Sequence, residues 1–188
     1  SEAANRDDAL RLAALMRTLN FLATPTIAKV NGAAYGGGVG LVACCDIAIG
    51  VESAKFALSE VKLGLVPAVI SPYVVAAIGL RQARRYFVSG EVFDAATAAR
   101  IGLLHESVAG DQLDAAVDRA VHFLGKGGPL AQGEAKQLAL RVAGVTRESA
   151  ERIDVENARL IAHMRVSDEG QRGLAAFLDK RAPDWVKE

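Results

Sequence analysis

Hydrophobic side chains recur at two spacings along this chain of 188 residues. Between residues 9 and 22, apolar side chains repeat every three or four positions, which predicts an amphipathic helix. We expect Asp7 or Asp8 to cap that helix and Pro25 to end it. The β-branched run at 26–30 has no such repeat and predicts a short buried strand.

Three consecutive glycines follow this strand. Gly36, Gly37 and Gly38 precede the apolar run 39–45, which we expect to form a short buried helix before a second strand at 46–50. Glycine permits a positive φ and lets a ligand approach the main chain, and the first N–H groups of a helix lack partners. The segment therefore indicates a site for an anion or for an oxygen that becomes anionic. A tight turn that needs small residues for packing is the alternative.

A glutamate lies in the next apolar stretch. We expect a short strand at 55–58, a loop that carries Glu60, and a turn at Gly64. Desolvation raises the pKa of a carboxyl group, so a glutamate in such surroundings can act as an acid or a base near neutral pH. The alternative is an exposed glutamate, or one that is paired with Lys62.

The remaining pattern is mainly helical. We expect helices over 72–79, 81–88, 95–101, 113–124, 129–142 and 147–165, a last strand near 104–108, and a final helix after Ser167. Asp94 and Thr146 are the expected caps of two of these helices. We therefore expect an α/β fold, with a core over residues 1–110 and a helical region over 111–188.

Composition narrows the class of protein. The chain has 22 basic and 22 acidic side chains, and this balance argues against nucleic acid or an acidic membrane as its main partner. We see no signal peptide and no apolar segment of membrane-spanning length, and the adjacent Cys44 and Cys45 do not suggest a disulfide scaffold. The histidines lack metal-ligand spacing. We therefore expect a cytoplasmic protein with no metal.

Four segments resemble, in order, the crotonase superfamily, which is the enoyl-CoA hydratase/isomerase group. They read P-T-I-A-K-V-N-G-A-A-Y-G-G-G-V-G-L-V-A-C-C-D-I-A-I, S-A-K-F-A-L-S-E-V-K-L-G-L-V-P, R-R-Y-F-V-S-G-E-V-F-D-A-A-T-A-A-R-I-G-L-L-H and G-L-A-A-F-L-D-K-R-A-P-D-W. The resemblance implies a spiral core of ββα units, a helical C-terminal trimerisation region, and a homotrimer or a dimer of trimers. It also implies that the N-terminal part of the core, with a second oxyanion donor, lies outside this sequence.

The resemblance further implies an acyl-CoA thioester as substrate and no separate cofactor. The backbone N–H of Gly37 would hold the thioester oxygen and stabilise an enolate. The other residues expected to bind the substrate are Ala34, Gly36, Gly38, Gly40 and Pro67 near the acyl group, and Phe177 and Lys180 near the nucleotide of CoA.

Two departures from the family pattern bear on the substrate. Hydratases of the family commonly use two glutamates, but this chain has Gly40 at the first position and keeps only Glu60, twenty residues later. We expect Glu60 to handle the water and the proton alone or with another group, and Gly40 to leave space near the acyl chain. Residues 67–72 read P-A-V-I-S-P in place of P-G-x-G-G. The combination resembles bacterial hydratases for methylglutaconyl-CoA and carboxygeranoyl-CoA, which implies a 3-methyl-branched 2-enoyl-CoA with a distal carboxylate.

Two other classes of function remain open. A catalytically impaired or non-catalytic acyl-CoA-binding homologue is favoured by the absence of a carboxylate at Gly40. A dinucleotide-binding oxidoreductase is suggested by an acid about 20 residues after the glycines. The spacing of the glycines at 36–40 is not G-x-G-x-x-G, however, so the sequence favours a hydratase over the oxidoreductase.

Overall fold

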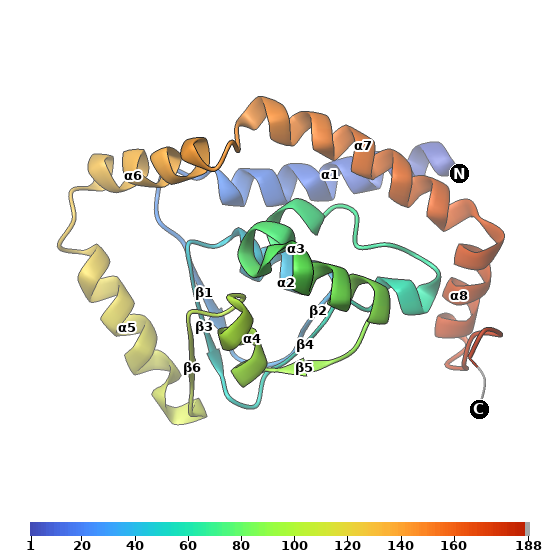
Figure 1. Cartoon of the computed structure of the whole chain (residues 1–188), viewed down its shortest axis with the longest axis horizontal. Coiled ribbons are helices and arrows are strands. Elements are labelled where there is room, and N and C mark those ends of the chain that lie inside the picture. Colours follow the sequence, from blue (N-terminus) through green and yellow to red (C-terminus); the bar gives the residue numbers. More distant parts are fainter. Residues whose placement is uncertain (187–188) are drawn as a thin grey trace.

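Two small sheets form the centre of the molecule, and helices surround them (Figure 1). The computed structural model describes residues 1–186. One sheet is parallel, in the order β1-β3-β6, and the other has the order β2-β4-β5 with an antiparallel β4–β5 pair. The strands are β1 (Ile27–Val30), β2 (Ala34–Tyr35), β3 (Ile47–Val51), β4 (Lys55–Ala57), β5 (Phe93–Asp94) and β6 (Glu106–Val108).

Helices make up most of the rest of the chain. The α-helices are α1 (Glu2–Asn20), α2 (Gly37–Cys44), α3 (Ser71–Ser89), α4 (Ala95–Ile101), α5 (Leu113–Leu124), α6 (Pro129–Val142), α7 (Arg147–Val166) and α8 (Asp168–Leu178). Two 3₁₀ helices, η1 (Ser59–Leu63) and η2 (Gly110–Gln112), connect them to the strands. Within the described part of the chain, no helix combines the length and the apolar character needed to cross a membrane.

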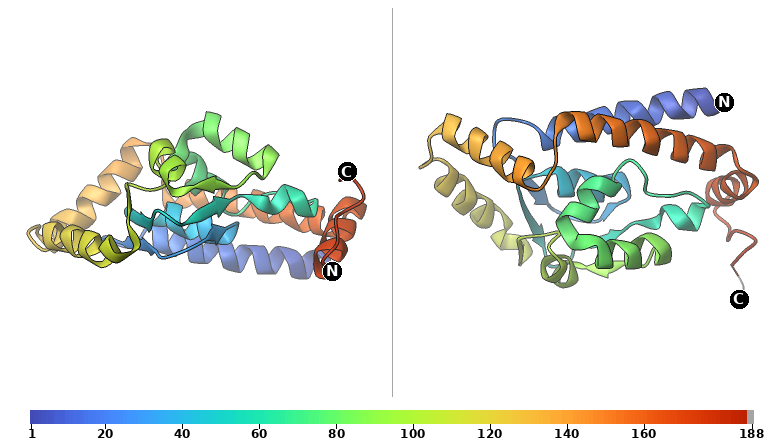
Figure 2. Two further views of the ribbon diagram at one scale, coloured as in Figure 1. Left: turned by 90° about the horizontal axis from the view of Figure 1, so that it is seen from below. Right: turned by 45° about the horizontal axis from the view of Figure 1, so that its top comes forward.

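The first and the seventh helix lie side by side. Figures 1 and 2 show α1 and α7 running antiparallel along one side of the molecule, with the N-terminus at the same end as α8. A buried ion pair between Arg17 of α1 and Asp154 of α7 joins them, and Asp154 is only 2% exposed. The core also includes Ala158 and Ile161 of α7, so this helix packs against the same apolar interior as the strands.

The order of elements around the glycines follows from local chemistry. β1 pairs in parallel with the central strand β3, with Ile27 opposite Ile47. β3 is almost entirely buried, which fits its apolar sequence, whereas the edge strand β1 is buried only at Val30 and exposes Lys29, so the strand predicted to be buried at 26–30 is only partly so. Gly36 then takes φ = 50°, a left-handed value that suits glycine, and α2 begins at the next residue. This abrupt change of direction brings the first turn of α2 beside η1.

Most of the predicted elements are present, and the differences have simple causes. The helix predicted over 9–22 in fact begins at Glu2, with Ser1 as its N-cap, so the prediction that Asp7 or Asp8 caps it is wrong. Residues 59–63 form a 3₁₀ helix in place of the predicted loop. The two-residue strands β2 and β5 were not predicted because they are too short to show alternation.

Several finer predictions agree with the structure. Asp94 and Thr146 cap α4 and α7, and Gly79, with φ = 74°, breaks α3 into the two predicted helices. The mixed α/β fold with a helical C-terminal region is confirmed. The division into parts at residue 110 and the trimer stay predictions.

Candidate active site

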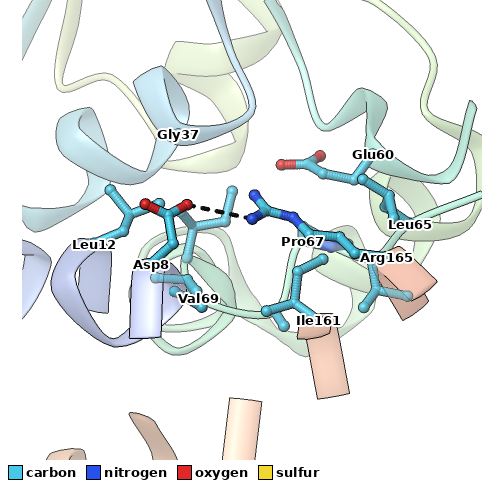
Figure 3. A pocket seen from close by; sticks show the side chains of 13 residues that line it. Asp8, Leu12, Gly37, Glu60, Leu65, Pro67, Val69, Ile161 and Arg165 are labelled. Carbon is cyan, nitrogen blue, oxygen red and sulfur yellow. Dashed lines mark hydrogen bonds and ion pairs between the residues drawn. The ribbon is translucent and has the colours of Figure 1, made fainter. Parts of the chain in front are cut away.

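A cavity of about 190 Å³ lies where α1, α2, α7 and the segment after β4 meet (Figure 3). Pockets for drug-sized ligands usually measure about 300–1,000 Å³, so this one suits a short acyl group rather than a whole coenzyme thioester. The residues that line it are Asp8, Ala9, Leu12, Gly37, Glu60, Leu65, Val66, Pro67, Ala68, Val69, Ile70, Ile161 and Arg165.

Gly37 brings the beginning of α2 to this cavity. The N–H of Gly36 donates a hydrogen bond to the carbonyl oxygen of Ala57 at 2.9 Å, which fixes the turn. The next two N–H groups, those of Gly37 and Gly38, have no hydrogen bond to the described residues. As the first groups of a helix they carry partial positive charge, so an oxygen that gains negative charge in the cavity is stabilised there.

Glu60 faces the same cavity from η1 (Figure 3). Its Oε2 atom is buried and has no hydrogen-bond partner among the described residues. Burial raises the pKa of this carboxyl group above the usual glutamate value, with a partly offsetting hydrogen bond to its own backbone. No ion pair with Lys62 is present in residues 1–186, so the alternative of a surface pair does not hold.

Gly36 explains how the carboxyl group comes so close to the glycine turn. A Cβ atom on Gly36 would lie 3.0 Å from Oε1 of Glu60, which is tighter than ordinary side-chain contact. The turn therefore needs glycine at position 36 both for its positive φ and for the approach of Glu60. The result is an unpaired amide and an unpaired carboxyl oxygen at one small cavity, which is an arrangement suited to proton transfer beside a developing oxyanion.

The space around Gly40 differs from what the sequence predicted. A Cβ atom there would lie 2.3 Å from Cγ2 of Ile70 and 3.2 Å from Cε of Met16. The expectation that Gly40 leaves free space near an acyl chain is therefore wrong, because Ile70 fills that space. Ile70, from the unusual P-A-V-I-S-P segment, lines the cavity itself.

The other predicted substrate-binding residues fall into two groups. Pro67 lines the cavity, whereas Ala34 and Gly38 pack beside each other behind it, where a Cβ on Gly38 would lie 3.5 Å from that of Ala34. Phe177 is 63% exposed on α8, and Lys180 follows that helix with φ = 55°. Neither of these two lines the cavity, and their roles toward CoA stay predictions.

A charged pair at the cavity has no signal in the sequence. Arg165, in the last turn of α7, reaches Asp8 of α1, with 3.3 Å between Nη1 and Oδ2 (Figure 3). These residues are 157 positions apart. The sequence pattern placed Arg165 at the end of one helix and Asp8 just before another, but it carries no signal that the two helices lie side by side.

Other reactive side chains have structural roles. Nδ1 of His105 accepts a hydrogen bond from the N–H of Ala48 at 3.0 Å. Cys44 and Cys45 are free thiols, and burial raises the pKa of Cys44 to about 12. Over residues 1–186, no cluster of histidine, cysteine and acidic side chains could hold a metal ion.

Comparison with known proteins decides the family. Residues 2–188 match the family model described as enoyl-CoA hydratase/isomerase. The chain belongs to this family. An enoyl-CoA hydratase structure from Mycobacterium avium is similar with a TM-score of 0.90 and 37% sequence identity, over 98% of this chain and 72% of that one. The crotonase-like fold that the resemblance of the four segments implied is thereby confirmed.

Curated enoyl-CoA hydratase/isomerase relatives carry different names. A hydroxycinnamoyl-CoA hydratase-lyase from Pseudomonas fluorescens is 35% identical over 170 residues, which are 88% of this chain and 60% of the relative. A mevalonyl-coenzyme A hydratase from Aspergillus fumigatus is 33% identical over 165 residues, which are 86% of this chain and 60% of the relative. The chain therefore spans about three fifths of the length of these relatives.

Proposed function

We propose that this protein hydrates a 2-enoyl-CoA, and that the substrate is 3-methyl-branched with a distal carboxylate, such as methylglutaconyl-CoA. One observation carries the proposal: Glu60, whose Oε2 atom is buried and unpaired, lines the same cavity as Gly37, whose N–H is also unpaired. Family membership supports a CoA thioester as the substrate.

The amide of Gly37 supplies the electrostatic part of the reaction. As water adds to C3 of the enoyl group, the electrons of the C2–C3 double bond move toward the thioester oxygen and form an enolate. The N–H of Gly37 donates to that oxygen, and the positive end of α2 stabilises its charge. The loss of one such donor usually costs about 2.7–4 kcal/mol of transition-state stabilisation.

Glu60 moves the protons. In its ionised form it accepts a proton from water while the water oxygen bonds to C3. In its protonated form it then donates a proton to C2 and collapses the enolate. One carboxyl group thus serves both carbons, which predicts addition to a single face of the double bond. A raised pKa helps, because burial makes the protonated form of this carboxyl group easier to reach than in an exposed glutamate.

The packing at Gly40 supports a mechanism with one carboxyl group. A second glutamate at that position has no room while Ile70 is present. The names of the two relatives support hydration of a CoA thioester, and they do not converge on one acyl group. The branched acyl group follows from the resemblance of the segments at 36–41 and 59–75, and the small cavity is compatible with it.

A non-catalytic acyl-CoA-binding protein is the second candidate. The glycine at position 40 favours it, because a carboxylate common in family hydratases is absent. Both candidates would bind acyl-CoA thioesters, but only the hydratase would convert an enoyl-CoA to product.

A substrate panel tests the proposal. Hydration of crotonyl-CoA, 3-methylcrotonyl-CoA and 3-methylglutaconyl-CoA is followed through the loss of enoyl-thioester absorbance, with the wild type and with Glu60→Gln. We expect the highest kcat/KM for 3-methylglutaconyl-CoA and a large loss in the variant. Saturable binding of these thioesters without any turnover would support the non-catalytic alternative instead.

A further inference from the structure

Arg165 places a positive charge in a cavity that is otherwise mostly apolar. Among the described residues that line the cavity it is the single cation, and the acidic ones are Asp8 and Glu60. Figure 3 shows its guanidinium extending into the pocket toward Asp8, on the side faced by the carboxyl group of Glu60. The reaction proposed above gives this charge no role.

A purely structural role explains the arginine poorly. The Arg165 side chain is 32% exposed and that of Asp8 is 58% exposed, and such surface pairs contribute only about 0–1 kcal/mol to stability. The helices that carry them are already joined by the buried Arg17–Asp154 pair and by the shared core. The fold therefore does not require this pair.

The guanidinium also has free hydrogen-bonding capacity. Among the described residues its nitrogen atoms contact only Asp8, through one nitrogen at 3.3 Å, and the remaining N–H groups are available. A planar guanidinium matches a carboxylate through two parallel hydrogen bonds, which a lysine does not reproduce. The walls of the same cavity also include the apolar side chains of Leu65 and Ile161, which fit the carbon chain of a short acyl group.

We propose that Arg165 binds a carboxylate at the far end of the acyl group and thereby selects acidic over neutral short-chain acyl-CoA thioesters. Asp8 holds the guanidinium in the cavity. A neutral acyl chain would displace water from the guanidinium of Arg165 without replacing its hydrogen bonds, which weakens binding of neutral thioesters. A carboxylate replaces those hydrogen bonds, which strengthens binding of acidic thioesters. The proposal rests on the acyl site of the proposed function and assigns a residue to its specificity.

Binding of unreactive thioesters tests this without any need for turnover. Glutaryl-CoA carries a terminal carboxylate, valeryl-CoA has the same number of acyl carbons without the charge, and neither has a double bond to hydrate. Their Kd values are measured by calorimetry with the full chain as wild type, Arg165→Met, Arg165→Lys and Arg159→Met. Arg159 is an exposed arginine on the same helix and does not line the cavity, so it controls for loss of charge on α7.

We expect the wild type and Arg159→Met to bind glutaryl-CoA more tightly than valeryl-CoA. Arg165→Met should bind glutaryl-CoA about 10- to 100-fold more weakly and leave valeryl-CoA unchanged, and Arg165→Lys should recover only part of the loss. Equal binding of the two thioesters by the wild type overturns the proposal, as does the absence of binding. Equal weakening of both by Arg165→Met also overturns it, because Arg165 would then contact the phosphates of CoA.

The outcome is separable from that of the proposed function. A preference for glutaryl-CoA that depends on Arg165, together with no hydration of any enoyl-CoA, supports the specificity role and removes the hydratase proposal. Hydration of crotonyl-CoA and 3-methylglutaconyl-CoA with equal efficiency, and no effect of Arg165→Met on either, supports the hydratase reaction but removes the specificity role of Arg165 and the preference for a distal carboxylate.

Discussion

Ile70 occupies the space that a side chain at position 40 would need, since a Cβ on Gly40 would lie 2.3 Å from its Cγ2 atom. A single packing contact therefore links the two departures from the family pattern. One is the glycine at position 40 in α2, and the other is the P-A-V-I-S-P segment. Ile70 is 3% exposed and also lines the cavity. The same contact thus shapes the wall of the site and excludes a second carboxylate from it.

This contact predicts strong coupling between the two positions. Gly40→Ala should lower the free energy of unfolding by about 1–3 kcal/mol through overpacking. Combining it with Ile70→Ala should recover part of that loss, because the second change removes Cγ2, the atom nearest to the added methyl group, while Cβ of residue 70 stays 2.8 Å from it. Urea denaturation of both single variants and the double variant measures the coupling, and strictly additive losses would contradict the contact.

The glycine turn predicts a functional defect at position 36. Gly36→Ala forces an L-residue to φ = 50°, at a cost of roughly 1–2 kcal/mol, and its Cβ would press on Oε1 of Glu60. We expect a modest fall in Tm and at least a tenfold loss of kcat. Gly32→Ala is the matched control, because a Cβ there meets nothing within 4 Å, and it should keep wild-type activity.

A substitution at Gly37 should affect ligand binding without affecting folding. A Cβ at this position meets no atom within 4 Å, and the residue lines the cavity, so the added methyl group would lie where the ligand approaches. The free energy of unfolding of Gly37→Ala should lie within about 0.5 kcal/mol of the wild-type value, but the variant should bind acyl-CoA more weakly. An unchanged Kd, measured by calorimetry, would count against a thioester oxygen at this amide.

Removing the charge of Glu60 should raise the free energy of unfolding by an amount that depends on pH. Because its pKa is raised in the folded state, the folded protein binds more protons than the unfolded chain above pH 4.5, and wild-type stability falls as pH rises through the window up to the folded pKa. Glu60→Gln should remove this fall. Denaturant titrations should show the variant more stable than the wild type at neutral pH, with no such gain below pH 4.5. A gain that is equal at both pH values would contradict the assignment.

The ion pair between α1 and α7 predicts a large cost for breaking it on one side. Asp154→Ala leaves Arg17 with only its looser contact to the exposed Glu151 at 3.7 Å and should lower the free energy of unfolding by about 1–3 kcal/mol. The double variant Arg17→Met with Asp154→Leu should be clearly more stable than Asp154→Ala, because no buried charge remains. Thermal unfolding of the three proteins tests this, and equal destabilisation of both variants would speak against an unpaired-charge penalty.

Local sequence signals predicted much of this molecule. The glycines at 36–38, the cap at Asp94 and the break at Gly79 each act through the backbone of their own segment, and all three have the expected effect. The family resemblance placed Glu60 at the site, while its apolar neighbours left an exposed or Lys62-paired side chain open; the structure shows it partly buried with an unpaired oxygen.

Features that depend on distant contacts were not predictable in the same way. The packing of Ile70 over Gly40 and the pairing of Arg165 with Asp8 join segments that periodicity treats separately. The packing of Ile70 contradicts the expectation that Gly40 leaves space near the acyl chain. The pairing of Arg165 with Asp8 added a charged group that no motif indicated, because its position follows only from the arrangement of α1 beside α7.

The most direct test of the central claim compares chemistry with binding in Glu60→Gln. We predict that kcat for hydration of 3-methylglutaconyl-CoA falls about 100- to 10,000-fold while the Kd for glutaryl-CoA stays nearly constant, because the variant keeps the shape of the cavity and loses the proton-transfer group. Glu52→Gln, which removes an exposed glutamate, should retain full activity. Undiminished turnover by Glu60→Gln would contradict the account.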